Sequence, residues 1–125
     1  MRIKEIMNHA IAVNHDIPIK EAAKIMTGKK IGSLIAMKGD KIAGILTDKD
    51  ITKSASDMNK KISSVMTRVV DTIQENESLI EAVDIMKKRK IKHLPVVNED
   101  GTLVGIVTAT DLIEHSDDLE EDFWM

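Results

Sequence analysis

The sequence contains no cysteine and no tyrosine, and Phe123 and Trp124 are its only two residues of the Phe, Trp and Tyr class. The absence of cysteine excludes disulfide bonds, thiolate catalysis and cysteine-ligated metal. Because aromatic residues make up only 2% of the chain, its core has to be built from aliphatic side chains and methionine. A base-stacking platform inside that core is therefore excluded.

Long apolar runs and strong net charge are also missing. No apolar stretch approaches the roughly 20 residues that cross a membrane, and Arg2, Lys4 and Glu5 interrupt any signal-peptide core at the N-terminus. The net charge of −3 argues against a nucleic-acid partner. We therefore expect a soluble, cytoplasmic protein without a membrane-embedded part.

Sequence motifs for catalysis are absent as well. The chain has neither a phosphate-binding GxxxxGK[ST] loop nor a GxGxxG dinucleotide fingerprint. Its four histidines are too scattered for a zinc site, and the acidic pair Asp48 and Asp50 has no neighbour that would separate the two groups into an acid and a base. We expect no catalytic residues, no metal site and no enzymatic activity.

What the chain does contain is an internal repeat. The motif G-I-x-T-x-x-D occurs at Gly44 and again at Gly105, so that Thr47 and Thr108 stand 61 positions apart in a chain of 125 residues. A period near 60 indicates two copies of one structural unit. Because a unit of this size alone leaves much apolar surface exposed, we expect the two halves to share one core.

Each repeat is predicted to form a short helix, a strand, a long helix, two strands and a closing helix, which gives an α+β fold. The spacing of apolar residues predicts the long helices near residues 19–26 and 79–86. Glycine-containing turns at residues 39–40 and 100–101 connect antiparallel strand pairs. The expected strands of these pairs are residues 31–37 and 42–46, then 91–97 and 103–107.

These patterns divide the chain into a first repeat (1–56), a linker (57–61), a second repeat (62–116) and an acidic C-terminal tail (117–125). The tail ends in Phe123-Trp124-Met125. We interpret these three residues either as packing on the protein's own dimer or fraying, or as a docking segment for another protein.

The runs IKHLPVV and DGTLVGIVTATDL, preceded by helix, strand and helix, resemble the CBS domain. Two such domains in tandem resemble a CBS pair, or Bateman module, and the resemblance covers nearly the whole chain. It implies a pseudo-two-fold arrangement whose packed sheets leave two clefts for adenosyl ligands, here AMP, ADP, ATP or S-adenosylmethionine. It also implies a homodimer. CBS pairs are often attached to enzymes or transporters, and we expect this chain to have no room for such a second domain.

The T-x-x-D segments have two interpretations. Thr followed three residues later by an acid is a capping box, which stabilises a helix start without any ligand. Alternatively, the free amides of a helix N-terminus bind phosphate, and the glycine three positions before each Thr allows another backbone or a ligand to approach closely. The spacing fits both interpretations.

By resemblance, the acids Asp50 and Asp111 would bind ribose, and the threonines would face phosphate together with the residue before each acid. The phosphate-facing residues would be Thr47, Lys49, Thr108 and Thr110. Because Lys49 carries a charge and Thr110 does not, the first site should favour the more highly charged ligand. Lys49 as an ordinary solvated lysine is equally compatible with the sequence.

The start of the second strand in each repeat also lines the cleft in the family. Ser33 takes this place in the first repeat, and Lys92, His93 and Pro95 in the second. The alternative for His93 is a structural strand-end histidine, and Pro95 fits a strand position whose amide is not needed for pairing. The basic ends of the long helices, residues 29–30 and 87–90, either complement the helix dipole or form an electropositive mouth beside the phosphates.

The sequence therefore favours a stand-alone sensor of adenosyl ligands that signals to an unidentified regulated protein. The alternative is a ligand-independent dimeric adaptor in which both T-x-x-D segments only cap helices.

Overall fold

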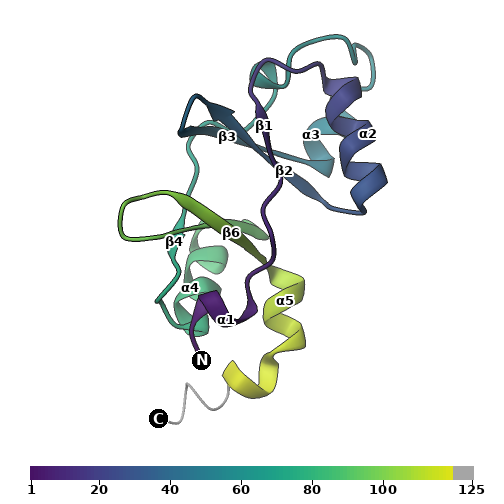
Figure 1. Cartoon of the computed structure of the whole chain (residues 1–125). Helices are drawn as coiled ribbons and strands as arrows, with labels where there is room; N and C mark the ends of the chain where they lie inside the picture. The colour runs from purple at the N-terminus through teal and green to yellow at the C-terminus, as the bar shows by residue number, and fades with distance from the viewer. Residues whose placement is uncertain (120–125) are drawn as a thin grey trace. The chain divides into compact units, whose positions relative to one another are not determined.

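The structure is a computed structural model, and it describes residues 1–119. It contains two three-stranded sheets accompanied by helices (Figure 1). The predicted α+β fold with two repeats of the same element order is confirmed. The proposed docking segment Phe123-Trp124-Met125 lies outside the described residues.

Both repeats follow the predicted order of elements. The first contains α1 (Ile3–Ile6), β1 (Ala12–Asn14), α2 (Ile19–Lys29), β2 (Ser33–Lys38), β3 (Lys41–Thr47) and α3 (Asp48–Lys53). The second contains the 3-10 helix η1 (Ile62–Ser64), β4 (Ile73–Gln74), α4 (Leu79–Arg89), β5 (His93–Val97), β6 (Leu103–Thr108) and α5 (Ala109–Glu114). Residues 116–119 form a further helical turn.

The two sheets have the same topology. In one, β2 lies between a parallel neighbour, β1, and an antiparallel neighbour, β3. In the other, β5 lies in the same way between β4 and β6. The hairpin turns carry Gly39 at φ +63° and Gly101 at φ +82°, where a residue with a side chain would be strained. The T-x-x-D motifs therefore occupy equivalent places, each spanning the end of a sheet-edge strand and the start of a short helix.

Pro95 shortens the second sheet relative to the first. In the first sheet the Ile35 amide donates to the Ile11 carbonyl at 3.0 Å. Pro95 occupies the equivalent position of β5 and has no amide hydrogen. Pairing of β4 with β5 accordingly begins at Ile73 and Val96, one residue later than in the first sheet. The proline fits because the hydrogen-bond ladder ends beside it.

The compact units of the chain differ from its sequence repeats. The β1–β3 unit comprises Ile11–Val70, and the β4–β6 unit comprises Met1–Ala10 together with residues 71–119. We call residues 3–10 and 62–70 the leading segments of the two repeats. Each leading segment belongs to the unit that contains the other repeat's sheet. In Figure 1 the purple α1 accordingly lies beside the green elements of the second repeat.

Equivalent backbone hydrogen bonds hold both leading segments. The Ile3 amide donates to the Glu77 carbonyl at 2.9 Å, and the Ile62 amide donates to the Ile17 carbonyl at 2.9 Å. Each acceptor precedes a long helix, α4 or α2. The exchange of leading segments is therefore the same in both units.

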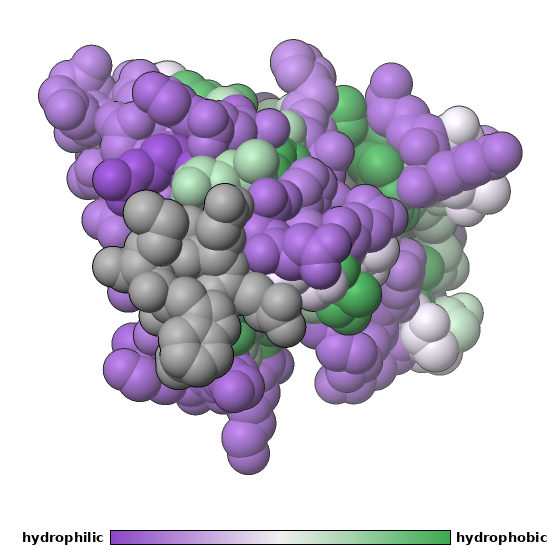
Figure 2. All heavy atoms as spheres, turned by 90° about the horizontal axis from the view of Figure 1, so that it is seen from below, coloured by the Kyte–Doolittle hydropathy of each residue, from purple (hydrophilic) through white to green (hydrophobic). Residues whose placement is uncertain are grey.

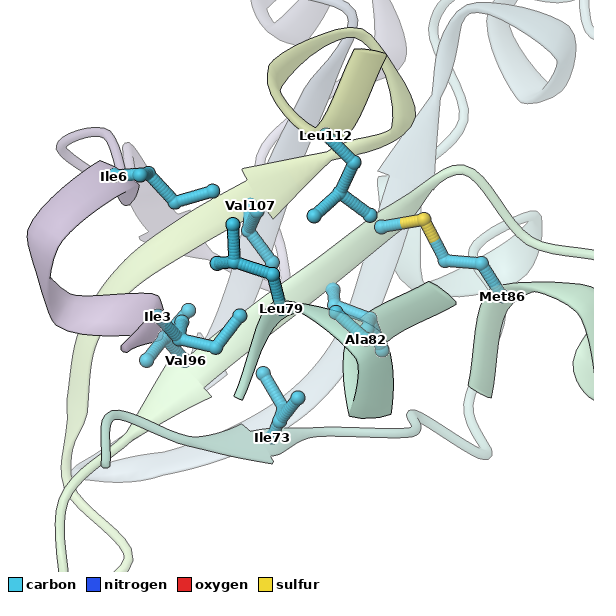
Figure 3. Close-up of a cluster of buried hydrophobic side chains, with 10 residues drawn as sticks. Ile3, Ile6, Ile73, Leu79, Ala82, Met86, Val96, Val107 and Leu112 are labelled. Atoms are coloured by element: carbon cyan, nitrogen blue, oxygen red, sulfur yellow. The ribbon is translucent and has the colours of Figure 1, made fainter. Parts of the chain in front are cut away.

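The leading segments also contribute to the hydrophobic cores. Ile3 is fully buried and Ile6 is 8% exposed, and both belong to the apolar cluster of the β4–β6 unit. Figure 3 shows them pointing from α1 towards Leu79 and Val107. Ile62 has the same role in the cluster of the β1–β3 unit. Burying one such side chain contributes about 1.5–3 kcal/mol.

Polar side chains cover most of the molecular face in Figure 2, in keeping with a chain in which 31% of the residues are charged. Among the helices of residues 1–119, none combines the length and the apolar character needed to span a bilayer.

Candidate ligand sites

Gly44 and Gly105, which open the duplicated motif, lie against the leading segment of their unit. A Cβ atom on Gly105 would lie 2.7 Å from Met7 Sδ and 2.9 Å from the Asn8 carbonyl oxygen. On Gly44 it would lie 2.7 Å from Met66 Sδ. Because these distances are well below ordinary contact, both positions require glycine. The close approach expected from the sequence is thus made by the chain's own backbone and methionines.

A pair of backbone hydrogen bonds fixes each leading segment to the edge strand beside it. Asn8 and Ile106 exchange amide-to-carbonyl bonds of 2.8 and 2.9 Å. Thr67 and Ile45 do the same at 3.0 and 2.9 Å. The side chains of Asn8 and Thr67 are therefore positioned by equivalent backbone beside the strands that end in T-x-x-D.

The motif at the start of α5 forms a complete capping box. The amide and hydroxyl of Thr108 donate to Asp111 Oδ2 at 2.8 and 2.9 Å, and the Asp111 amide donates back to Thr108 Oγ1 at 3.3 Å. Asn8 Nδ2 donates to the same carboxylate oxygen at 2.8 Å. Among the described residues, all three donors to the carboxylate bond to Oδ2. Oδ1 therefore keeps its lone pairs for a further donor.

The motif at the start of α3 is also a capping box, with fewer donors. The Thr47 amide donates to Asp50 Oδ2 at 2.8 Å, and the Thr47 hydroxyl lies 3.3 Å from the same oxygen. Both acids are therefore used as helix caps. Capping is consequently established for the two motifs, and it leaves one oxygen of each carboxylate for a second role.

The β-sheet register brings further predicted site residues to the same places. Ser33 pairs with Thr47, and His93 pairs with Thr108. The first helical amide of α5, that of Ala109, donates to the Lys92 carbonyl at 2.9 Å. Each T-x-x-D motif thus lies directly across from the start of its unit's central strand.

Burial differs among the predicted site residues. Ser33 is only 7% exposed, and Pro95 is among the fully buried side chains. Lys49, Lys92 and Thr110 are exposed to solvent. The two residues that precede the acids, Lys49 and Thr110, are therefore accessible in the first turn of their helices.

The backbone carbonyl of each acid is held by the residue four positions later. Ser54 Oγ donates to the Asp50 carbonyl at 2.7 Å, and His115 Nδ1 lies 3.0 Å from the Asp111 carbonyl. These contacts close the short helices on which the acids stand. The β1–β3 unit therefore uses a serine, and the β4–β6 unit a histidine, to contact the backbone carbonyl of the acid.

The basic helix ends remain at the surface. Residues 29–30 and 87–90 are exposed, and Arg89 pairs with Asp71 at 3.4 Å. Within residues 1–119 no group of three or more His, Asp or Glu side chains is arranged to hold a metal ion.

The sequence interpretation did not include Asn8. Aligning the repeats by the shared Ile and Met of their leading segments places Asn8 opposite Thr67, and this difference between the copies was the available signal. The contact itself joins residues 103 positions apart, so local patterns do not reveal it.

Comparison with known proteins agrees with this architecture. The CBS domain family matches the chain twice, over residues 3–57 and 62–118. These two matches account for almost all of the 125 residues. The chain belongs to the CBS domain family and contains a tandem pair of these domains.

Its relatives include both isolated pairs and larger proteins. The CBS domain pair of protein MJ0100, solved in complex with 5′-methylthioadenosine and S-adenosyl-L-methionine, is 34% identical with a TM-score of 0.87, covering 94% of this chain and 96% of that one. The uncharacterized protein MJ1232 of Methanocaldococcus jannaschii is 31% identical over 90% of this chain and 36% of its own length. Inosine-5′-monophosphate dehydrogenase of Thermoplasma acidophilum is 36% identical over 86% of this chain and 22% of its own.

The chain thus spans only the CBS part of the enzyme relative and about a third of MJ1232.

Proposed function

We propose that the chain is a regulatory module that binds adenosyl ligands at its two T-x-x-D sites and reports their occupancy to a partner protein. The candidate ligands are AMP, ADP, ATP and S-adenosylmethionine. The module binds these molecules without transforming them. A ligand shifts such a module between two states only as far as its affinities for the states differ.

One observation carries the proposal. Each unit presents an acid whose Oδ2 is engaged in a capping box, while the carboxylate retains acceptor capacity for a ligand. A carboxylate in this position can accept hydrogen bonds from the two hydroxyls of a ribose, as an acid does at dinucleotide sites. Support comes from the 34% identical CBS pair of MJ0100, whose ligands both contain an adenosyl group.

The proposed roles are those that the resemblance to CBS pairs implies for the residues of each unit. Asp50 and Asp111 bind ribose, and the remaining residues face the base or the phosphates. These remaining residues are Thr47, Lys49 and Ser33 in one unit, and Thr108, Thr110, Lys92, His93 and Pro95 in the other.

The exposed residue before each acid distinguishes the two sites. Lys49 supplies an ammonium group next to Asp50, whereas Thr110 supplies a hydroxyl next to Asp111. A charge-assisted hydrogen bond to phosphate is stronger than a neutral one. We therefore expect the β1–β3 unit to favour the more highly charged ligands, ATP and ADP.

The rival function is a ligand-independent dimeric adaptor. It is favoured by the capping boxes, which give both acids a structural role. In this alternative the acids serve stability alone, and the two chains of a dimer present a fixed surface to a partner.

A thermal denaturation series with AMP, ADP, ATP and S-adenosylmethionine separates the two functions. For a ligand at about 100 times its dissociation constant, the folded state gains about 2.7 kcal/mol, which raises the melting temperature. Isothermal titration calorimetry then gives the number of sites. The absence of a shift with all four ligands would leave the adaptor.

Asp50→Asn and Asp111→Asn test the assignment of the two sites. Asparagine keeps a side-chain oxygen that can accept from the capping threonine, so the fold should persist with a small loss of stability. Each variant should lose one binding event because the charged acceptor for ribose is gone. Unfolding of both variants, with no separable effect on ligand affinity, would favour capping as the only role.

We further propose that two chains associate into a homodimer that acts in the cytoplasm. Sedimentation velocity with and without ligand tests the association and its dependence on occupancy. A monomer under both conditions would exclude the dimer.

A further inference from the structure

Asn8 marks the clearest difference between the two candidate sites. The backbone around it is duplicated, because Asn8 and Thr67 make the same pair of hydrogen bonds to β6 and β3. The side chains differ: Asn8 Nδ2 reaches Asp111 Oδ2 at 2.8 Å. A threonine hydroxyl stands one bond closer to the backbone than an asparagine amide. In residues 1–119 the corresponding acid, Asp50, receives side-chain and backbone donors from Thr47 only.

The third donor changes how the carboxylate is held. Three bonds from two different segments fix the rotation of the Asp111 carboxylate, whereas Asp50 is held by a single residue. A group that is already oriented loses less conformational freedom when it binds a ligand. Because the three donors occupy Oδ2, the orientation they fix is that of Oδ1.

We propose that Asn8 is a positioning residue for ribose recognition, which orients Asp111 so that Oδ1 is presented to the ribose hydroxyls of an adenosyl ligand. The proposal rests on the proposed function of Asp111. It makes the β4–β6 unit the site that selects for an intact ribose diol. The β1–β3 unit, with Thr67 at the same place, selects less strongly for this group.

The test compares adenosine with 2′,3′-dideoxyadenosine, which has the same base and lacks both ribose hydroxyls. Two-dimensional NMR titration of the full chain follows the amides of Thr108 and Thr47, which report on the two sites separately. In the wild-type protein, adenosine should bind more tightly than the dideoxy compound, and by a larger factor at the Thr108 site.

Asn8→Thr installs the residue of the other repeat. We expect the preference for adenosine at the Thr108 site to fall about 3- to 10-fold, the scale of one intramolecular hydrogen bond. The preference at the Thr47 site should not change. Thr67→Ala is the matched control, because it removes a side chain from the same backbone position in the other unit, and it should leave both preferences unchanged.

A purely structural role for Asn8 predicts a different result. If the Asn8 side chain only fastens the leading segment to β6, Asn8→Thr should lower the melting temperature and weaken both nucleosides equally. If Asn8→Thr leaves the ratio of the two affinities at the Thr108 site unchanged, the proposal is overturned. It is also overturned if Thr67→Ala lowers the preference for adenosine at the Thr47 site by the same factor. Failure of the wild-type protein to bind the two nucleosides and also AMP, ADP, ATP and S-adenosylmethionine would instead refute the proposed function itself.

Discussion

At the scale of single residues, the duplicated motif combines a steric requirement with a hydrogen-bonding one. Gly44 and Gly105 are needed because the leading segment lies directly on the strand. Asp50 and Asp111 are needed because they close capping boxes. The motif therefore has a structural role in both units.

Gly105→Ala should destabilise the protein by about 1–3 kcal/mol, because the new methyl group would overlap Met7 and the backbone of Asn8. Gly28→Ala is the matched control. A Cβ on Gly28 meets nothing within 4 Å, and the residue lies in α2, so alanine should stabilise the protein by about 0.5–1 kcal/mol. Urea denaturation measures both changes, and a stable Gly105→Ala variant would show that the leading segment can move aside.

The residues that could be predicted are those whose role depends on nearby sequence. The Thr and Asp of each motif stand three positions apart, and their local geometry follows from that spacing. Asn8 could not be found in this way, since its bond to Asp111 depends on how the chain folds back on itself. The sequence therefore predicted the two acids as candidate residues but not the Asn8 side chain that bonds to Asp111.

At the scale of elements, apolar spacing predicted the long helices well. Ile19, Ala22 and Met26 of α2 are buried as expected. The strand predicted from Ile31 begins at Ser33 instead, because the Ile31 amide donates to the Met26 carbonyl at 3.0 Å and still belongs to the helix end. Ile91 does the same with the Met86 carbonyl at 3.1 Å. Hydrophobicity marks these residues as buried without revealing which element uses their amides.

Both long helices end at a lysine in the left-handed conformation, Lys30 and Lys90, each at φ +56°. This conformation costs a residue with a side chain about 1–2 kcal/mol. Lys30→Gly should therefore stabilise the protein by about 0.5–1 kcal/mol after the greater flexibility of glycine in the unfolded chain is subtracted.

The control is Lys29→Gly, one position earlier and still helical. It should destabilise the protein by a similar amount, because glycine is a poor helix former. Thermal melting of the two variants gives the comparison. Equal shifts in the same direction would contradict the assignment of the helix end to Lys30.

At the scale of the whole molecule, the exchange of leading segments was not predictable from the repeat. The sequence shows that Ile3 and Ile62 are equivalent, and it does not show which sheet each one covers. In the structure Ile3 belongs to the core of the β4–β6 unit, and Ile62 to that of the β1–β3 unit. Stability is therefore shared between repeats through the packing of these short segments.

Ile3→Ala should destabilise the β4–β6 unit by about 2–5 kcal/mol, because the side chain is fully buried. Amide hydrogen exchange should accelerate most in β4–β6 and α4, although Ile3 belongs to the first repeat by sequence. Ile62→Ala is the reciprocal variant and should loosen α2 and β1–β3. Exchange that accelerates within the mutated repeat instead would contradict the observed units.

The exchange also limits how the protein can be divided. A fragment cut between the repeats would carry the α1 that completes the β4–β6 core and lack the η1 that completes its own. Such a fragment could bury its apolar face only by borrowing the missing piece from a second molecule. In the intact chain both missing pieces are supplied within one polypeptide, so each repeat completes the core of the other.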